Sequence, residues 1–252
     1  MPVEKLLIAN RGEIAIRIAR AAGDLGITSV AIFSSDDHLS LHRQVSDESV
    51  GLEGGGVAAY LDIDGIVASA VSSGCDAVHP GYGFLAENAD FASALEAEGI
   101  TFVGPLSEQL ALFGDKLSAR NLATRLDVPV VAATSGAATL GEVEAFLAEH
   151  GAIMVKAVAG GGGRGMRELR QGQDAATIFE RCQSEAQSAF GNGDLYAEKL
   201  IEAARHIEVQ IIGDGSSVAH FGERECTLQR QNQKIIEVAP SPSISTETRQ
   251  LL

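Results

Sequence analysis

The sequence is poor in aromatic residues and rich in acidic ones. Tryptophan is absent and aromatic residues make up 5% of the 252 residues, which leaves little material for the stacking platforms of single-strand nucleic-acid binders. Lysine and arginine number 19 against 34 acidic residues, so the net charge is −15, and such a surface repels nucleic acid and anionic membranes. We therefore expect no nucleic-acid and no membrane partner, and any anion site must be local.

Cysteines and long apolar runs are also scarce. The cysteines, Cys75, Cys182 and Cys226, are odd in number and far apart, which fits neither a disulfide framework nor a CxxC metal site. Charged residues interrupt the N-terminal stretch, and no window supplies the ~18 apolar residues of a membrane span. The sequence therefore predicts buried thiols in a folded cytoplasmic protein, whose 45% hydrophobic content suffices for a core.

Strands and helices alternate over residues 1–105. A strand, a helix and a strand are predicted in turn at "EKLLIAN", "RGEIAIRIARAAGDLG" and "ITSVAIF". The pattern continues with helix and strand pairs at "DIDGIVASAVSSG" and "CDAVHP", and at "ENADFASALEAEG" and "ITFVG". Such alternation indicates an α/β fold with a doubly wound parallel sheet.

The pattern changes after this first domain. Residues 106–130 read as a helical linker that leads to the strand "VPVVAAT", and residues 131–201 read as a small α+β domain. In residues 202–252 the strands "RHIEVQIIGD", "SVAHFGERE" and "QKIIEVAP", separated by "GDGSS" and "CTLQRQN", predict an antiparallel sheet. A last helix is expected to start at Ser245 or Thr246 and to be cut off inside a larger fold, since so short a helix is unstable alone.

The stretch "VKAVAGGGGRGMR", residues 155–167, is the first candidate site. The glycines lie between two strands, so neither the Rossmann fingerprint nor the Walker A pattern applies. Without Cβ atoms, Gly160–Gly163 could bring backbone N–H groups up to a phosphate, with Lys156 and Arg164 adding positive charge. A flexible hairpin turn is the alternative. The flanking charges favour a nucleotide triphosphate.

Three further stretches carry charge or donors. Lys116 in "FGDKLSAR" and the pair Glu198 and Lys199 in "YAEKLIEAARHIEVQ" could equally be ordinary surface charges. The stretch "ERECTLQRQNQK", residues 223–234, concentrates donors that need either a bound anion or acidic side chains opposite. We favour the anion.

The loop "HPGYGFLAEN", residues 79–88, follows a strand at the carboxyl edge of the first sheet. Ligands of open parallel sheets bind at that edge, although the glycines could merely shape a turn. His38 and His42 have a spacing of four residues but lie among acids without a third ligand. We interpret them as a solvated face and expect no metal ligand in this chain.

Taken together, these stretches resemble one family in order and spacing, the biotin carboxylase component of biotin-dependent carboxylases, an ATP-grasp enzyme. The resemblance runs through essentially the whole chain but covers only about the first half of a usual biotin carboxylase. It rests on the following motifs: "IANRGEIAIRIARAA", "HPGYGFLAENADFA", "GDK", "VKAVAGGGGRGMR", "EKLIEAARHIEVQ" and "ERECTLQRQNQKIIEVAPSP".

The resemblance implies a fold and a reaction. A pre-ATP-grasp sheet domain would be followed by the ATP-grasp lid and by the start of a truncated antiparallel ATP-grasp domain. The reaction would be attack of bicarbonate on ATP to give carboxyphosphate, followed by carboxyl transfer to biotin on a carrier protein or domain. A carboxyltransferase and a homo-oligomer are the further partners implied. The final acyl acceptor stays open, because acetyl-CoA, propionyl-CoA, pyruvate and urea carboxylases share these motifs.

The resemblance also implies site residues. Lys234 would bind bicarbonate as the catalytic residue, and Tyr82 would lie near the biotin ring. ATP would be held by Lys116, Lys156, Gly162, Gly163, Glu198, Lys199, Ile201, His206, Gln229 and Asn232. Magnesium ligands, a catalytic arginine and the base that activates bicarbonate are expected beyond Leu252, so the fragment should be inactive alone.

The chain departs from the family at Gln231, where a second arginine is common, and at Asn232, which is histidine in some members. The first difference removes a positive charge beside the anion site and could weaken nucleotide or bicarbonate binding. Two other functions stay open: another ATP-grasp ligase, such as a carbamoyl-phosphate or purine-pathway enzyme, and a non-catalytic nucleotide-binding or assembly module.

Overall fold

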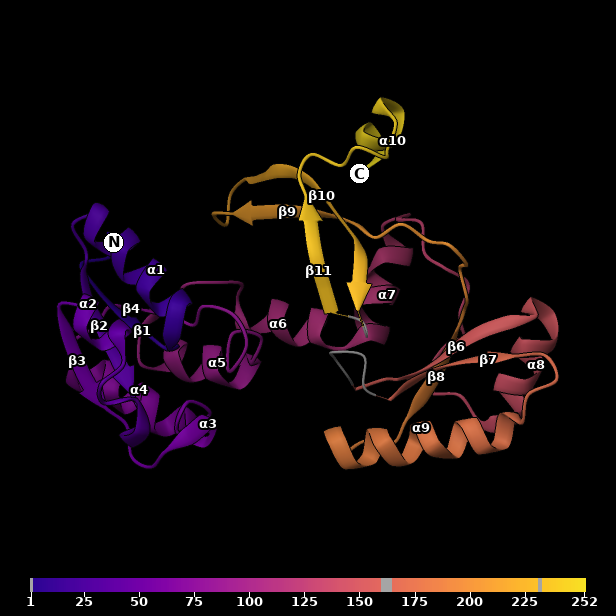
Figure 1. Cartoon of the computed structure of the whole chain (residues 1–252), viewed down its shortest axis with the longest axis horizontal. Helices are drawn as coiled ribbons and strands as arrows, with labels where there is room; N and C mark the ends of the chain where they lie inside the picture. The colour runs from indigo at the N-terminus through magenta and orange to yellow at the C-terminus, as the bar shows by residue number, and fades with distance from the viewer. Residues whose placement is uncertain (1, 160–164, 231–232) are drawn as a thin grey trace. The chain divides into compact units, whose positions relative to one another are not determined.

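The computed structural model describes residues 2–159, 165–230 and 233–252 (Figure 1). The chain divides into two compact units, Met1–Ala119 and Arg120–Leu252, and each is described by itself. Among the described residues no helix is both long and apolar enough to cross a membrane.

The first unit is built on a parallel sheet with the strand order β3-β2-β1-β4-β5. Its strands are β1 (Lys5–Ile8), β2 (Thr28–Phe33), β3 (Glu48–Gly51), β4 (Ala77–His79) and β5 (Thr101–Phe102). Its helices are α1 (Gly12–Asp24), α2 (Leu41–Val45), α3 (Gly56–Ala59), α4 (Ile63–Ser72), α5 (Ala89–Ala97) and α6 (Ser107–Gly114), and α7 (Lys116–Arg125) runs into the second unit. The doubly wound α/β fold is confirmed, although β3 was not predicted.

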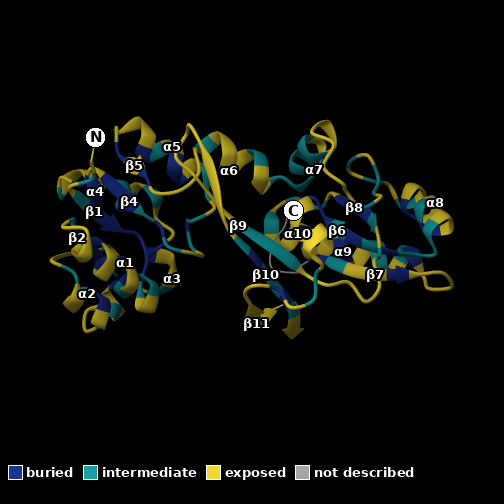
Figure 2. Ribbon diagram, turned by 90° about the horizontal axis from the view of Figure 1, so that it is seen from above, coloured by how far each residue is buried: buried dark blue, intermediate teal, exposed yellow. Residues whose placement is uncertain are grey.

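Hydrophobic layers lie on both faces of this sheet. Leu6 and Ile8 of β1 pack with α1 on one face, while Leu7 faces the other way and packs with α4 and α5. This alternation follows from the pleat of a strand, in which successive side chains point to opposite faces. Because β1 is central and covered on both sides, it is buried almost throughout (Figure 2), as parallel strands usually are.

The second unit contains two antiparallel sheets. One has the order β7-β6-β8 and consists of β6 (Ala152–Ala157), β7 (Met166–Arg170) and β8 (Leu195–Lys199), with α8 (Leu140–His150) and α9 (Ala175–Phe190) packed on it. The other has the order β11-β10-β9 and consists of β9 (Ile207–Gly213), β10 (Val218–Arg230) and β11 (Gln233–Val238). The last helix, α10 (Thr246–Leu251), begins after Ser245, whose side chain accepts a hydrogen bond from Thr248 N.

Two sequence predictions in this unit are wrong. The stretch "VPVVAAT" forms no named strand, because it adds to the edge of β8 only by an isolated bridge from Ala133 to Glu198 and a few backbone hydrogen bonds. The stretch "CTLQR" is not a loop but the end of β10, where Cys226 is fully buried and the side chains of Thr227 and Gln229 contact His206. All three cysteines are buried and free, as predicted.

Candidate functional site

Lys156 lies at the end of β6, shortly before the glycine-rich loop, and pairs with Glu198 of β8. The register places Lys156 opposite Tyr196, so Glu198 is its diagonal neighbour on the same face of the sheet, within reach of a long side chain. Lys156 Nζ donates a hydrogen bond to Glu198 Oε2, and both side chains are mostly buried. The structure therefore brings two of the residues predicted to hold ATP into direct contact.

A second cation reaches the same carboxylate. Arg120 Nη1 of α7 lies 3.7 Å from Glu198 Oε1. The phenol of Tyr196 is buried beside this group, and burial, with the nearby Glu198 charge, raises its pKa. Sequence reasoning missed Arg120, because nothing in a helical arginine indicates that it faces a strand almost 80 positions later.

Lys199 and Ile201, two further predicted nucleotide residues, follow Glu198 at the end of β8. Lys199 ends β8 with an exposed side chain, and its N–H donates to Ala132 O at 2.8 Å. Ile201 is 55% exposed just after the strand. Lys116 is the first residue of α7 in the other unit. Gly162, Gly163 and Asn232 lie outside the described residues.

The second group of site residues is centred on Glu208 of β9. Its Oε2 accepts a hydrogen bond from Lys234 of β11 and its Oε1 accepts one from Arg224 of β10. Arg224 Nη1 also donates to Glu237 Oε2 at 2.6 Å. The hydrogen bond with Glu208 raises the pKa of Lys234, and the same bond lowers the pKa of Glu208. The ammonium of Lys234 is thereby held charged.

His206 and Gln229 are brought together at one side of this group. Gln229 Nε2 lies 2.9 Å from His206 Nδ1, and His206 Nε2 lies 3.9 Å from Glu208 Oε2. Two donors of "ERECTLQRQNQK", Arg224 and Lys234, therefore face acidic side chains of the same sheet, which was the alternative to a bound anion. Sequence reasoning missed Glu208, although its place two residues after His206 in an alternating strand was a usable signal.

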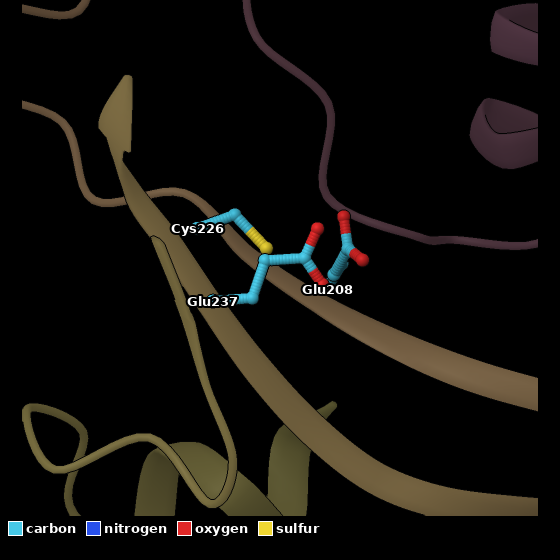
Figure 3. A group of neighbouring side chains, drawn as sticks. All are labelled: Glu208, Cys226 and Glu237. Carbon is cyan, nitrogen blue, oxygen red and sulfur yellow. The ribbon is translucent and has the colours of Figure 1, made fainter. Parts of the chain in front are cut away.

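One cluster in the described part of the chain has the composition of a metal site. The ligand atoms of Glu208, Cys226 and Glu237 all lie within 4.8 Å of one another (Figure 3). However, both carboxylates already accept hydrogen bonds from Arg224 or Lys234. Burial also raises the pKa of the Cys226 thiol, and the protonated thiol is a poor metal ligand. The cluster is better described as an ion-pair network.

Tyr82 belongs to the loop that follows β4 in the first unit. Its hydroxyl donates to Glu13 Oε1 at 2.6 Å, which raises the pKa of the phenol. The buried side chain of Asn10, after β1, donates to Pro80 O at 2.7 Å and to Tyr82 O at 2.9 Å. Asn10 and this loop thus meet where the strand order reverses between β1 and β4, the usual ligand position of such sheets.

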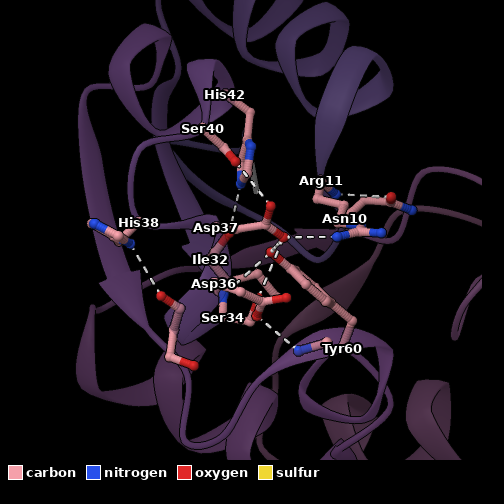
Figure 4. Close-up of polar contacts among 12 residues, drawn as sticks. Asn10, Arg11, Ile32, Ser34, Asp36, Asp37, His38, Ser40, His42 and Tyr60 are labelled. Carbon is pink, nitrogen blue, oxygen red and sulfur yellow. Dashed lines mark hydrogen bonds and ion pairs between the residues drawn. The ribbon is translucent and has the colours of Figure 1, made fainter.

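A polar cluster beside this edge gathers around Asp37 (Figure 4). The carboxylate accepts hydrogen bonds from Arg11 at 3.0 Å, Tyr60 at 2.8 Å and Ser40 at 2.9 Å. Burial alone would raise the pKa of Asp37, but these hydrogen bonds lower it to about 2. The cluster fixes the segment after β2 and contains no residue predicted for the site.

His42 departs from the prediction of a solvated histidine face. It is 1% exposed, and its Nε2 lies 3.1 Å from the carbonyl oxygen of Ile32. His38 points elsewhere and is 3.1 Å from Ser35 O (Figure 4). The two histidines therefore share no ligand position, because α2 turns His42 inward against β2.

The sequence comparisons agree with this arrangement. Residues 115–252 match the family described as "Carbamoyl-phosphate synthase L chain, ATP binding domain". The chain therefore belongs to the class of proteins with an ATP-grasp ATP-binding domain. Residues 2–110 match the "Biotin carboxylase, N-terminal domain". With both domains in series, the chain belongs to the biotin carboxylase family, which confirms the resemblance inferred from the motifs.

Individual relatives cover nearly all of this chain. It is 51% identical to the pyruvate carboxylase of Bacillus subtilis over 98% of the chain and 22% of that protein. It is 44% identical to the chloroplastic biotin carboxylase 2 of Populus trichocarpa over 99% of the chain and 48% of that protein. The chain thus spans less than half the length of either relative.

Solved structures give the same result. The biotin carboxylase domain dimer of Hydrogenobacter thermophilus 2-oxoglutarate carboxylase, in complex with MgADP, ADP and bicarbonate, is 42% identical with a TM-score of 0.95 over 99% of the chain and 56% of that structure. The biotin carboxylase of Campylobacter jejuni, in a β-γ-ATP complex, is 38% identical with a TM-score of 0.96 over 99% of the chain and 57% of that structure. These matches confirm the fold class.

Proposed function

We propose that this chain is part of an enzyme that carboxylates biotin with ATP and bicarbonate. One oxygen of bicarbonate attacks the γ-phosphorus of ATP, giving carboxyphosphate and ADP. The carboxyl group then passes to a ureido nitrogen of biotin, the proton of that nitrogen goes to the departing phosphate, and inorganic phosphate is released. Two anions must be held together for the first step, so cations and backbone donors that lower their repulsion supply much of the rate.

The observation that carries this proposal is the presence of two lysines, each paired with one partly buried carboxylate. Lys156 pairs with Glu198, and Lys234 pairs with Glu208. Each lysine therefore faces an acidic partner that an incoming anion can replace. We assign Lys156 to the ATP phosphates and Lys234 to bicarbonate, so the pair matches the two anionic substrates.

The remaining assignments follow the family motifs. Magnesium would neutralise charge on the phosphates when bound, and no described residue is assigned to it. Tyr82 would contact the biotin ring. Lid closure over the phosphates would exclude water that hydrolyses carboxyphosphate. We assign nucleotide binding to Lys116, Gly162, Gly163, Glu198, Lys199, Ile201, His206, Gln229 and Asn232.

The proposed partners are a biotin carrier and a carboxyltransferase, as domains of one polypeptide or as separate subunits. Support comes from the pyruvate carboxylase relative, of which this chain covers only 22%. The cytoplasmic location expected from the charged N-terminal stretch is likewise a proposal. The domain limits of residues 1–105, 106–130, 131–201 and 202–252 remain a proposal too.

The deciding experiment measures ATP cleavage by the full-length polypeptide that carries this chain. We expect cleavage that requires bicarbonate and is stimulated by free biotin. Cleavage that requires an amide donor instead supports another ATP-grasp ligase. Nucleotide binding without cleavage supports an assembly module. The Lys234→Ala variant is the matched control, because it should keep nucleotide binding while losing bicarbonate-dependent turnover.

A further inference from the structure

Glu198 is a partly buried carboxylate that has two cationic neighbours instead of one. Lys156 Nζ donates to Oε2, while Arg120 Nη1 lies 3.7 Å from Oε1. The side chains of Arg120 and Glu198 are each only 19% exposed. Ion pairs at this depth matter more than surface pairs, because removing one partner leaves a charge that water screens poorly.

Local structure holds Arg120 in this position. Its Nη2 donates a hydrogen bond to the carbonyl oxygen of Val131. The residues that follow Val131 are fastened to β8, since Lys199 N donates to Ala132 O at 2.8 Å and Thr134 N donates to Ala197 O at 2.9 Å. The guanidinium is therefore tied to the same strand edge that carries Glu198, by contacts that do not involve Lys156.

The two cations have different tasks under the proposed function. Lys156 is assigned to the phosphates of ATP, and a single ammonium cannot neutralise both a triphosphate and Glu198. When Lys156 turns to the phosphates, Glu198 would be left unpaired close to a second negative group. A charge in that position is costly unless another cation stays with it.

We propose that Arg120 is a positioning residue for nucleotide binding, which keeps Glu198 neutralised and so releases Lys156 to the phosphates. This inference rests on the proposed function, because it takes Lys156 as a phosphate ligand. Arg120 itself touches no substrate in this scheme and acts through Glu198. Lys156 can therefore leave Glu198 for the phosphates, because the Glu198 carboxylate keeps Arg120 as a cationic neighbour.

The test uses the full-length polypeptide and compares Arg120→Met with Arg120→Lys. Binding of a non-hydrolysable ATP analogue is measured by calorimetry. Arg120→Met should raise the Kd about tenfold, which corresponds to ~1.4 kcal/mol, and Arg120→Lys should recover most of the affinity. In turnover, KM for ATP should rise while kcat at saturating ATP stays the same. Arg125→Met is the matched control, because Arg125 is an exposed arginine of the same helix.

A double-mutant cycle tests whether Arg120 acts through Glu198. In a Glu198→Gln background there is no carboxylate to neutralise, so Arg120→Met should change the Kd by less than about twofold. An equal loss of affinity in both backgrounds would overturn the proposal and indicate a purely structural role through Val131. Unchanged affinity in the Arg120→Met single variant would overturn it as well.

If Arg120→Met fails to fold, binding of inorganic triphosphate provides a second test. Triphosphate has no adenine, so its competition with the ATP analogue reports the phosphate contacts alone. Glu198→Gln should tighten triphosphate binding, because Lys156 no longer has a competing partner, and weaker binding would refute the scheme. Failure of the proposed function looks different: the wild type would bind nucleotide but cleave none of it with bicarbonate.

Discussion

Gly81 and Gly83 allow a comparison in which one structural variable changes. Both have φ of +67°, where an L side chain is strained. A Cβ on Gly83 would meet nothing within 4 Å, whereas a Cβ on Gly81 would lie 2.8 Å from Asn10 Nδ2 and 3.2 Å from Ile14 Cγ1. The two alanine variants therefore share the backbone strain and differ in the space available.

The expected difference follows from the hydrogen bonds of Asn10. An alanine at positive φ costs about 1 kcal/mol at either position. At Gly81 the Asn10 amide must also move, which weakens its bonds to Pro80 O and Tyr82 O at roughly 1 kcal/mol each. We therefore expect Gly81→Ala to lower the free energy of unfolding by about 3 kcal/mol and Gly83→Ala by about 1 kcal/mol.

Urea unfolding followed by circular dichroism measures the stabilities, and hydrogen exchange in α1 and β4 assigns them to the first unit. KM for free biotin should rise more in Gly81→Ala than in Gly83→Ala, because Asn10 no longer holds the Tyr82 loop. Adding Asn10→Ala to Gly81→Ala should relieve the clash, so the two costs should not add. Equal destabilisation by the two alanines, or full additivity with Asn10→Ala, would refute the reasoning.

Three further predictions concern charged groups. The pKa of Asp37 is about 2 against an ordinary 3.8, so its carboxylate adds about 2 kcal/mol to the free energy of unfolding. This contribution is fully present above pH ~4 and is lost as the pH falls toward 2. Asp37→Asn should remove this contribution at pH 7. If the free energy of unfolding, measured with urea, falls between pH ~4 and pH ~2 as steeply in the variant as in the wild type, the assignment is contradicted. Glu208→Gln removes the partner that raises the pKa of Lys234, so the alkaline limb of the pH profile of kcat/KM for bicarbonate should move to lower pH. An alkaline limb that stays in place would count against the pairing. Lys234→Ala should raise KM for bicarbonate more than Kd for ATP, and an equal loss of both would argue against a bicarbonate role.

The sequence predicted those parts of the fold that depend on local pattern. The alternation of strand and helix in the first unit, and the amphipathic α8 and α9, are periodic over enough residues to be unambiguous. The edge segment "VPVVAAT" has the composition of a strand but gains only an isolated bridge to β8. Composition alone does not say whether a partner strand is available.

The site was predictable as a set of motifs but not as a set of contacts. Lys156 and Lys234 could be selected from their sequence neighbours, whereas their partners Glu198 and Glu208 depend on strand register. Arg224 stands opposite Glu208 in a ladder that is interrupted by a bulge between His220 and Glu223. Because one slipped residue moves a side chain to the other face, such pairs cannot be read from spacing.

The inward turn of His42 has a similar cause. Its neighbours in the sequence are polar or charged, so a solvated position was the natural expectation. Contact with the Ile32 carbonyl requires α2 to pack on β2, which is a tertiary event. Long-range packing overrides local composition here.

The three buried cysteines happen to lie in three different substructures. Cys75 belongs to the core of the parallel sheet, Cys182 to α9, and Cys226 to β10. Burial raises the pKa of Cys75 and of Cys182 to about 11, so at neutral pH these thiols react slowly until their surroundings open. The alkylation rate of each cysteine, resolved by mass spectrometry, would therefore report the opening of its own substructure in a chain without introduced labels.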